Sequence, residues 1–346
     1  MNGEQLEREI HEQPAVISTL LEAENNAVAR IVEAVRGRFD YILIAARGTS
    51  DNAARYAQYL LGIHNHLSVM LATPSVLTLY GAAPSMARAL VVGISQSGQS
   101  PDIIAVLEEG RRQKRPTLAI TNDPASPLAN AAEHVIQLHA GLERAVAATK
   151  TYTASLAAIA LLSTHLENGA EHRAELAALP GLMQRMLEDS ATLLPRFERY
   201  RYMEHCAVIG RGFNYATAFE IALKVKELAS VIAEPYSSAD FLHGPIAVIA
   251  KGFPALVVAP SGATLVDLQH LVGRLIEQQA ELILISDAAS LLGHAHVPIQ
   301  LPTGCPEWLT PLVAVLPGQL FGLALARART MDPDHPAGLT KVTETW

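Results

Sequence analysis

The sequence predicts an α/β protein made of two tandem doubly wound parallel-sheet domains, each an α-β-α sandwich. Short apolar runs of strand length alternate with segments of helical periodicity, an order typical of parallel sheets covered by helices on both faces. The halves also repeat, because three pairs of residues in turns after such runs are each 164 residues apart: Arg47 with Arg211, Gly98 with Gly262, and Asp123 with Asp287. This constant offset predicts two copies of one domain.

Composition limits the class of protein. The chain has 346 residues, of which 50% are hydrophobic and 17% charged, so it can build large cores and is not a disordered protein. A net charge of −8 without a basic stripe argues against nucleic acid as a partner. The polar start and the two cysteines, Cys206 and Cys305, suggest neither a signal peptide nor a disulfide framework, and we expect a cytoplasmic protein. Prolines interrupt the apolar segment 308–326, which predicts a core helix rather than a membrane span.

The elements follow in order along the chain. Residues 1–35 form a predicted N-terminal helical segment, which Pro14 should break into two pieces. The first domain, 36–166, contains predicted strands at 41–46, 68–72, 89–94, 117–121 and 135–138, a helix at 51–61 and a closing helix at 147–165. A helical connector, 167–200, leads to the second domain, 201–330, with predicted strands at 207–210, 254–259 and 282–285. The tail, 331–346, is too rich in proline and glycine for a long helix.

The segment 93–103 (GISQSGQSPDI) is the clearest candidate binding element. It leaves a predicted buried strand and opens a predicted helix, whose first N–H groups and dipole favour an anion. An ordinary helix cap would need one serine, whereas the hydroxyls here can orient a phosphate. The equivalent segment of the second half, 259–264, lacks the dense hydroxyl set, so we expect the phosphate in the first half.

Three further features carry chemistry. Glu220, Lys224 and Glu227 share one helix face, either as a solvated salt-bridge ladder, which spacing alone favours, or as an acid–base set beside an ammonium. His243 precedes Gly-Pro and lies in a loop or helix start, where a lone histidine is more often structural. The pairs His64/His66 and His294/His296 have no acidic or cysteine partner at a familiar ligand spacing, so no metal is predicted.

Together these motifs resemble the sugar isomerase (SIS) double-domain family, which has flavodoxin-like domains. The resemblance runs from about residue 30 to the C-terminus and rests on the following motifs in order: RGTS at 47–50, SQSG at 95–98, VAATK at 146–150, EIALKVKE at 220–227, LHGP at 242–245, and Lys341 in the tail. The chain looks like the isomerase half of glucosamine-fructose-6-phosphate aminotransferases and, more closely, like stand-alone SIS-type glucosamine-6-phosphate deaminases. Only some 35 residues precede the first predicted strand, so we expect no glutaminase domain.

The resemblance implies a role for each matching residue. Glu227 would move a proton between C1 and C2, Lys224 would steady the enediol oxygen, and Glu220 would support Lys224. His243 would open the sugar ring and reach the neighbouring subunit's site, which implies a homodimer. Lys341 would form an imine with the open-chain sugar, and the role of Arg47 is open. The phosphate would be held by Ser95, Gln96, Ser97 and Ser100 with Thr49 and Ser50 nearby, and the sugar would contact Gly48, Ala147 and Ala148.

The implied reaction converts glucosamine 6-phosphate and water to fructose 6-phosphate and ammonia, with no metal or organic cofactor. Alternatives on the same scaffold are a glutamine-fructose-6-phosphate aminotransferase-like isomerase, a galactosamine-6-phosphate isomerase and a fructosyl-amine-6-phosphate deglycase. A non-catalytic sugar-phosphate sensor is an alternative of another class. The two domains, the complete Glu220, Lys224 and Glu227 set and the lack of a basic N-terminal module weigh against the sensor.

Overall fold

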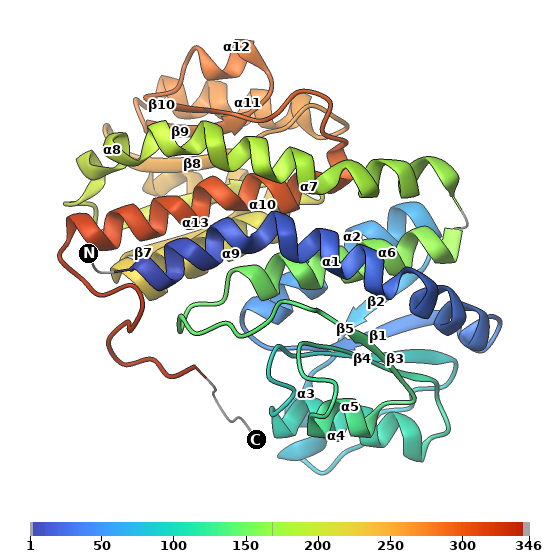
Figure 1. The fold of residues 1–346 in the computed structure, drawn as a ribbon. Coiled ribbons are helices and arrows are strands. Elements are labelled where there is room, and N and C mark those ends of the chain that lie inside the picture. Colours follow the sequence, from blue (N-terminus) through green and yellow to red (C-terminus); the bar gives the residue numbers. More distant parts are fainter. Residues whose placement is uncertain (1–2, 168, 342–346) are drawn as a thin grey trace. The chain divides into compact units, whose positions relative to one another are not determined.

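The computed structural model describes residues 3–167 and 169–341 (Figure 1). Residues 342–346 of the predicted tail lie outside the described residues. The chain divides into two compact units. The first unit comprises Glu12–Glu143, Lys150–Ala178 and the tail from Thr340, and the second comprises the N-terminus to His11, Arg144–Thr149 and Leu179–Leu339. Each unit contains one five-stranded parallel sheet, which confirms the predicted fold class. The domain boundaries predicted from sequence stay predictions.

The first helix corrects one expectation. Helix α1 runs without interruption from Glu4 to Val35, with Pro14 inside it, rather than breaking into two pieces. A proline inside a helix removes one backbone hydrogen bond. On either side of it, Ile10 and Ile17 are fully buried, and the burial of such side chains outweighs the loss of one bond.

The sheet of the first unit has the order β2-β1-β3-β4-β5, with every neighbouring pair parallel. Helix α4 packs with α5 and α2 packs with α6, and Figure 1 shows these pairs on opposite faces of the sheet. The strands are β1 (Tyr41–Ala45), β2 (Ser68–Leu71), β3 (Ala89–Ile94), β4 (Thr117–Thr121) and β5 (His134–Gln137), and the helices are α2 (Thr49–Asn65), α3 (Pro74–Thr78), α4 (Pro101–Arg112), α5 (Pro127–Ala131) and α6 (Lys150–Glu167).

The second unit repeats this topology. Its sheet has the order β10-β9-β8-β6-β7, which is the first order with each strand replaced by its counterpart. The strands are β6 (His205–Gly210), β7 (Ile232–Ser237), β8 (Pro254–Val258), β9 (Glu281–Ser286) and β10 (Val297–Gln300). The helices are α9 (Asn214–Ala229), α10 (Ser238–Leu242), η3 (Pro245–Val248), α11 (Leu265–Glu277), α12 (Ala289–Leu292), η4 (Glu307–Leu309) and α13 (Thr310–Ala328). The predicted connector is helical, with α7 (Ala170–Ser190), η1 (Ala191–Leu193), α8 (Leu194–Phe197) and η2 (Glu198–Tyr200).

Helix α13 is a core helix. In the described part of the chain, Glu307–Ala328 is the one helical stretch long and apolar enough to cross a membrane, and 94% of its most apolar window is buried in the protein. Helix α13 packs along α9, and Figure 1 shows the two helices side by side. Gly318 and Gly322 of α13 lie against Ile221 and Leu228 of α9, so small residues allow the two helices to approach closely.

We expect Gly318→Ala to destabilise the second unit. A Cβ atom at position 318 would lie 2.3 Å from Cγ1 of Ile221, which is fully buried. Such overpacking costs about 1–3 kcal/mol, measurable as a lower midpoint of urea unfolding. Gly273→Ala in α11 is the control, because a Cβ there meets nothing within 4 Å and should leave stability unchanged or slightly higher. Equal midpoints for the two variants would contradict the expected overpacking.

Candidate functional site

Two polar turns meet at one edge of the first sheet. The strand order reverses between β1 and β3, which pair from Tyr41 with Ala89 to Ala45 with Gly93. Ligands of open parallel sheets bind beyond the carboxyl ends of the strands at such a reversal. Most of the predicted phosphate and sugar contacts lie where the chain leaves these two strands. Gly48 is in the turn after β1, with Thr49 and Ser50 at the start of α2, and the turn after β3 contains Ser95, Gln96, Ser97 and Ser100.

The turn after β3 is braced by its own hydroxyls. Ser95 Oγ accepts a hydrogen bond from Gly98 N at 3.1 Å, and Ser97 Oγ accepts one from Gln99 N at 3.3 Å. A hydroxyl that accepts in this way keeps its own proton to donate. Ser100 stands at the N-cap of α4, but its side chain makes no capping bond to the described helix. The turn therefore presents hydroxyl donors beside the N-terminus of a 12-residue helix, as an anion requires.

We expect Gly98→Ala to weaken phosphate binding by about tenfold or more, equivalent to at least ~1.4 kcal/mol. Gly98 has a φ of +63°, and a Cβ atom there would lie 2.1 Å from Ser126 Oγ, so the turn must move. Isothermal titration with inorganic phosphate measures the loss. Gly141→Ala is the matched control, because Gly141 has a φ of +62° but a Cβ there meets nothing within 4 Å. If both variants bound phosphate equally, the clash at Gly98 would not govern the turn.

The corresponding turn of the second unit is already filled by carboxylates of the same chain. Ser261 N donates to Asp287 Oδ1 at 2.6 Å, and Ala263 N donates to Glu307 Oε2 at 2.9 Å. Glu307 Oε1 also accepts from Thr264 Oγ1 at 3.4 Å. Backbone donors that could face a phosphate therefore face internal anions, which supports the prediction of phosphate in the first half.

An ion pair joins the turn after β1 to helix α4. Arg47 lies two residues beyond the end of β1, and its Nε donates to Asp102 Oδ2 in the first turn of α4 at 2.8 Å. The Asp102 side chain is fully buried, whereas 46% of the Arg47 side chain is exposed. Sequence reasoning left the role of Arg47 open and did not single out Asp102.

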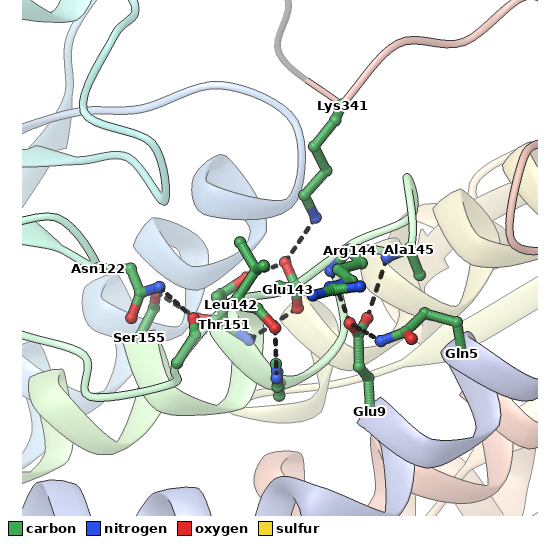
Figure 2. Close-up of polar contacts among 12 residues, drawn as sticks. Gln5, Glu9, Asn122, Leu142, Glu143, Arg144, Ala145, Thr151, Ser155 and Lys341 are labelled. Atoms are coloured by element: carbon green, nitrogen blue, oxygen red, sulfur yellow. Dashed lines mark hydrogen bonds and ion pairs between the residues drawn. The ribbon is translucent and has the colours of Figure 1, made fainter.

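The tail lysine is held by a buried carboxylate (Figure 2). Lys341 Nζ donates to Glu143 Oε2 at 2.8 Å, and the Glu143 side chain has no exposed surface. Glu143 also accepts from Thr151 N at 3.1 Å and Thr151 Oγ1 at 2.8 Å, so its orientation is fixed. The motif comparison did not include Glu143. The one feature of the sequence that could have pointed to Glu143 is that it is an acidic residue just before the run of small residues at 145–149.

The segment with Ala147 and Ala148 precedes helix α6 instead of opening it, because α6 begins at Lys150. In the second unit, Glu9 of α1 accepts from Arg144 N at 2.6 Å and from Ala145 N at 3.2 Å, contacts that Figure 2 shows. These bonds commit two N–H groups to a side chain, and residues 145–147 form a bend, so the helix does not begin there. Ala147 is buried and Ala148 half-buried, and the contact of this segment with a sugar stays a prediction.

Helix α9 brings together three of the groups predicted to carry the reaction. Lys224 Nζ donates to Glu227 Oε2 at 2.5 Å and lies 3.5 Å from Glu220 Oε1. The side chains of Glu220 and Lys224 are fully buried, whereas 23% of the Glu227 side chain is exposed. A solvated salt-bridge ladder is therefore excluded. The arrangement is a buried ammonium between two carboxylates, of which only Glu227 reaches the surface.

His243 follows α10 in the second unit and is exposed. Its N–H donates to Asp240 O at 3.1 Å, and Ser237 Oγ accepts from Asp240 N at 3.2 Å, which caps the short helix. Gly244, with a φ of +142°, turns the chain directly afterwards. The loop geometry thus presents the histidine side chain to solvent.

One group of possible metal ligands occurs among the described residues: His64, Glu167 and His172 of the first unit. The two imidazoles are stacked with centroids 4.2 Å apart and planes 7° from parallel, and His172 Nδ1 lies 2.7 Å from Glu167 Oε2. One ion cannot lie in both of two parallel ring planes, so this arrangement does not fit a shared metal as it stands. Burial raises the pKa of the Cys206 thiol to about 12, so it is not a candidate nucleophile.

Comparison with known proteins points to one family. The SIS domain family matches residues 40–164 and 201–326. The glutamine–fructose-6-phosphate aminotransferase (isomerizing) of Methanothermobacter thermautotrophicus is 33% identical over 344 residues, which cover 96% of this chain and 56% of that protein. The chain thus spans about half the length of the curated relatives it matches.

Solved structures with a similar fold include proteins that act on aminosugar phosphates by their names. The C-terminal domain of glucosamine-fructose-6-phosphate aminotransferase from Francisella tularensis is 26% identical with a TM-score of 0.87, covering 96% of this chain and 98% of that one. Glucosamine-6-phosphate deaminase from Thermotoga maritima is similar in fold, with a TM-score of 0.81 at 19% identity, covering 99% of this chain and 100% of that one.

Proposed function

Because the chain belongs to the SIS domain family, we propose that it is an aminosugar-phosphate isomerase that interconverts glucosamine 6-phosphate and water with fructose 6-phosphate and ammonia. The observation that carries the proposal is the buried set on α9, in which Lys224 stands between Glu220 and Glu227. A sensor needs to bind a sugar phosphate but has no use for a buried ammonium against a carboxylate. Such a set suits proton transfer with stabilisation of developing charge.

The proposed sequence begins with ring opening. The turn after β3 holds the 6-phosphate, and His243 moves the proton of the C1 hydroxyl to the ring oxygen. Glu227 then takes the proton from C2 while the ammonium of Lys224 gives a proton to the C1 oxygen, which forms an enolamine. Glu227 returns its proton to C1 as the C2 amino group gives a proton back to Lys224. The product of this step carries an imine at C2. These steps need positioned acid and base groups only, so the proposal includes no metal or organic cofactor.

Lys341 completes the proposed reaction. Its amine adds to the C2 imine and displaces ammonia, which forms a new imine between the lysine and the sugar. Water then adds to that carbon, and fructose 6-phosphate leaves as the lysine is regenerated. Glu143 supports this role as a positioning residue, because it fixes the lysine and can accept or return its proton.

A homodimer belongs to the same proposal. His243 is exposed at the end of α10, as a group that serves the neighbouring subunit's site would be. Sedimentation of the purified protein tests the dimer. Mixing His243→Ala chains with Glu227→Gln chains tests the shared site, because a hybrid dimer should regain activity at one of its two sites.

Ammonia release is the deciding experiment. The protein is incubated with glucosamine 6-phosphate, galactosamine 6-phosphate and the fructosyl-amine 6-phosphates, and ammonia is measured with a coupled dehydrogenase. Release from the first alone supports the proposal, and release from one of the others selects the corresponding alternative. Binding of these compounds without any release of ammonia or isomerisation would favour the sensor.

A further inference from the structure

We propose that Arg47 is the cationic arm of the phosphate site and sets its preference for phosphorylated sugars. The inference rests on the proposed function, because it assumes that the turn after β3 holds a phosphate. Every side chain predicted to contact that phosphate is neutral. A sugar phosphate carries close to two negative charges at neutral pH, and hydroxyls and a helix N-terminus supply only partial charges. Arg47 supplies a full positive charge at the same edge of the sheet.

The geometry around Arg47 leaves its binding face open. Nε is engaged with Asp102 Oδ2 at 2.8 Å. Among the described residues, neither terminal nitrogen of Arg47 has a hydrogen-bond partner, and nearly half of the side chain is exposed. These terminal nitrogens form the fork with which arginine binds phosphate oxygens in pairs.

Asp102 acts as the anchor of this arm. It lies two residues after Ser100, in the first turn of α4, and its Oδ1 accepts from Ile103 N at 2.9 Å while Oδ2 holds Arg47. The carboxylate is fully buried and fixed through both oxygens. The ion pair therefore ties the turn after β1 to the start of α4, on the two sides of the strand-order reversal.

A simpler explanation is that Arg47 only neutralises Asp102. A buried carboxylate without a partner is costly, so removing Arg47 alone would lower stability for this reason in either case. The double variant Arg47→Gln/Asp102→Asn separates the two explanations, because it removes both charges and leaves no uncompensated anion. If Arg47 only balances Asp102, the double variant binds phosphate as the parent protein does.

The experiment titrates inorganic phosphate and fructose 6-phosphate into the full chain by calorimetry, at low and high salt. We expect the double variant to bind both ligands at least about tenfold more weakly, as for the loss of a charge-assisted hydrogen bond, and to show a smaller salt dependence. Urea unfolding should show that its stability lies near that of the parent protein. Arg88→Gln/Asp40→Asn is the matched control, because it neutralises both members of an exposed ion pair elsewhere in the first unit.

The outcomes are distinct. Unchanged phosphate affinity in the double variant overturns the role of Arg47 and leaves the proposed function intact. Weakened phosphate binding in the double variant, with no turnover of any aminosugar phosphate by the parent protein, supports Arg47 and overturns the proposed reaction. A parent protein that binds neither inorganic phosphate nor fructose 6-phosphate overturns both proposals.

Discussion

Replacing Glu227 by Gln is expected to lower the rate of ammonia release from glucosamine 6-phosphate by about 10²- to 10⁴-fold, the usual contribution of a general base. The amide has the size of the carboxylate and can still accept a hydrogen bond from Lys224, so the change removes the base and keeps the packing. Phosphate affinity should remain that of the parent protein, because the turn after β3, which is proposed to hold the phosphate, belongs to the other unit. Steady-state kinetics and calorimetry measure the two effects separately.

Glu234→Gln is the matched control for Glu227→Gln. Glu234 lies in the same unit and pairs with Lys226 at 3.8 Å, but 54% of its side chain is exposed. An exposed pair of this kind contributes little to stability, and the variant should keep full activity. Turnover by Glu227→Gln within tenfold of the parent would show that another group is the base.

Replacing Lys341 by Met should abolish covalent trapping of fructose 6-phosphate and lower ammonia release by about 10²-fold or more. Methionine keeps much of the length and apolar stem of lysine but has no amine to form the imine. Borohydride reduces an imine to a stable amine, so intact mass spectrometry after treatment with fructose 6-phosphate shows whether the sugar is attached.

Two variants complete the test of Lys341. Lys251→Met removes an exposed lysine of the second unit and should leave trapping unchanged. Glu143→Gln weakens the anchor while the amine stays in place, so trapping should persist at a reduced rate. Full trapping in Lys341→Met would assign the imine to another lysine and remove the tail from the proposed mechanism.

The duplication and all the strands except β7 and β10 could be predicted, because each depends on local pattern. Buried parallel strands are short apolar runs, and β3 and β4 match the predicted limits, because turn residues follow each run directly. The early start predicted for the helix at 147 failed for a reason that lies elsewhere in the chain. Glu9, far away in sequence, binds the backbone N–H groups of Arg144 and Ala145.

In the candidate site, too, some features follow from local sequence pattern and others depend on residues far away in the chain. Spacing placed Glu220, Lys224 and Glu227 on one helix face, but only packing could decide that the first two are buried. Motif resemblance pointed to Lys341, whereas its partner Glu143 is 198 positions away and carries no local signal. A sequence pattern records which residues share a face or a turn. Pairs that form across the fold, such as Arg47 with Asp102, appear only in three dimensions.

The carboxylates in the second turn suggest how the duplicated halves diverged. Backbone N–H groups at the end of a parallel strand attract negative charge whether or not a substrate is present. In the second copy of the turn, the carboxylates of Asp287 and Glu307 accept hydrogen bonds from these N–H groups, where a ligand's anion would otherwise have to compete. If the second turn binds no substrate, the second unit can serve another part of the proposed reaction, namely the acid–base chemistry of helix α9. Under the proposed function, only the first copy of the turn would hold a phosphate, so the protein would have one phosphate site fewer than it has domains.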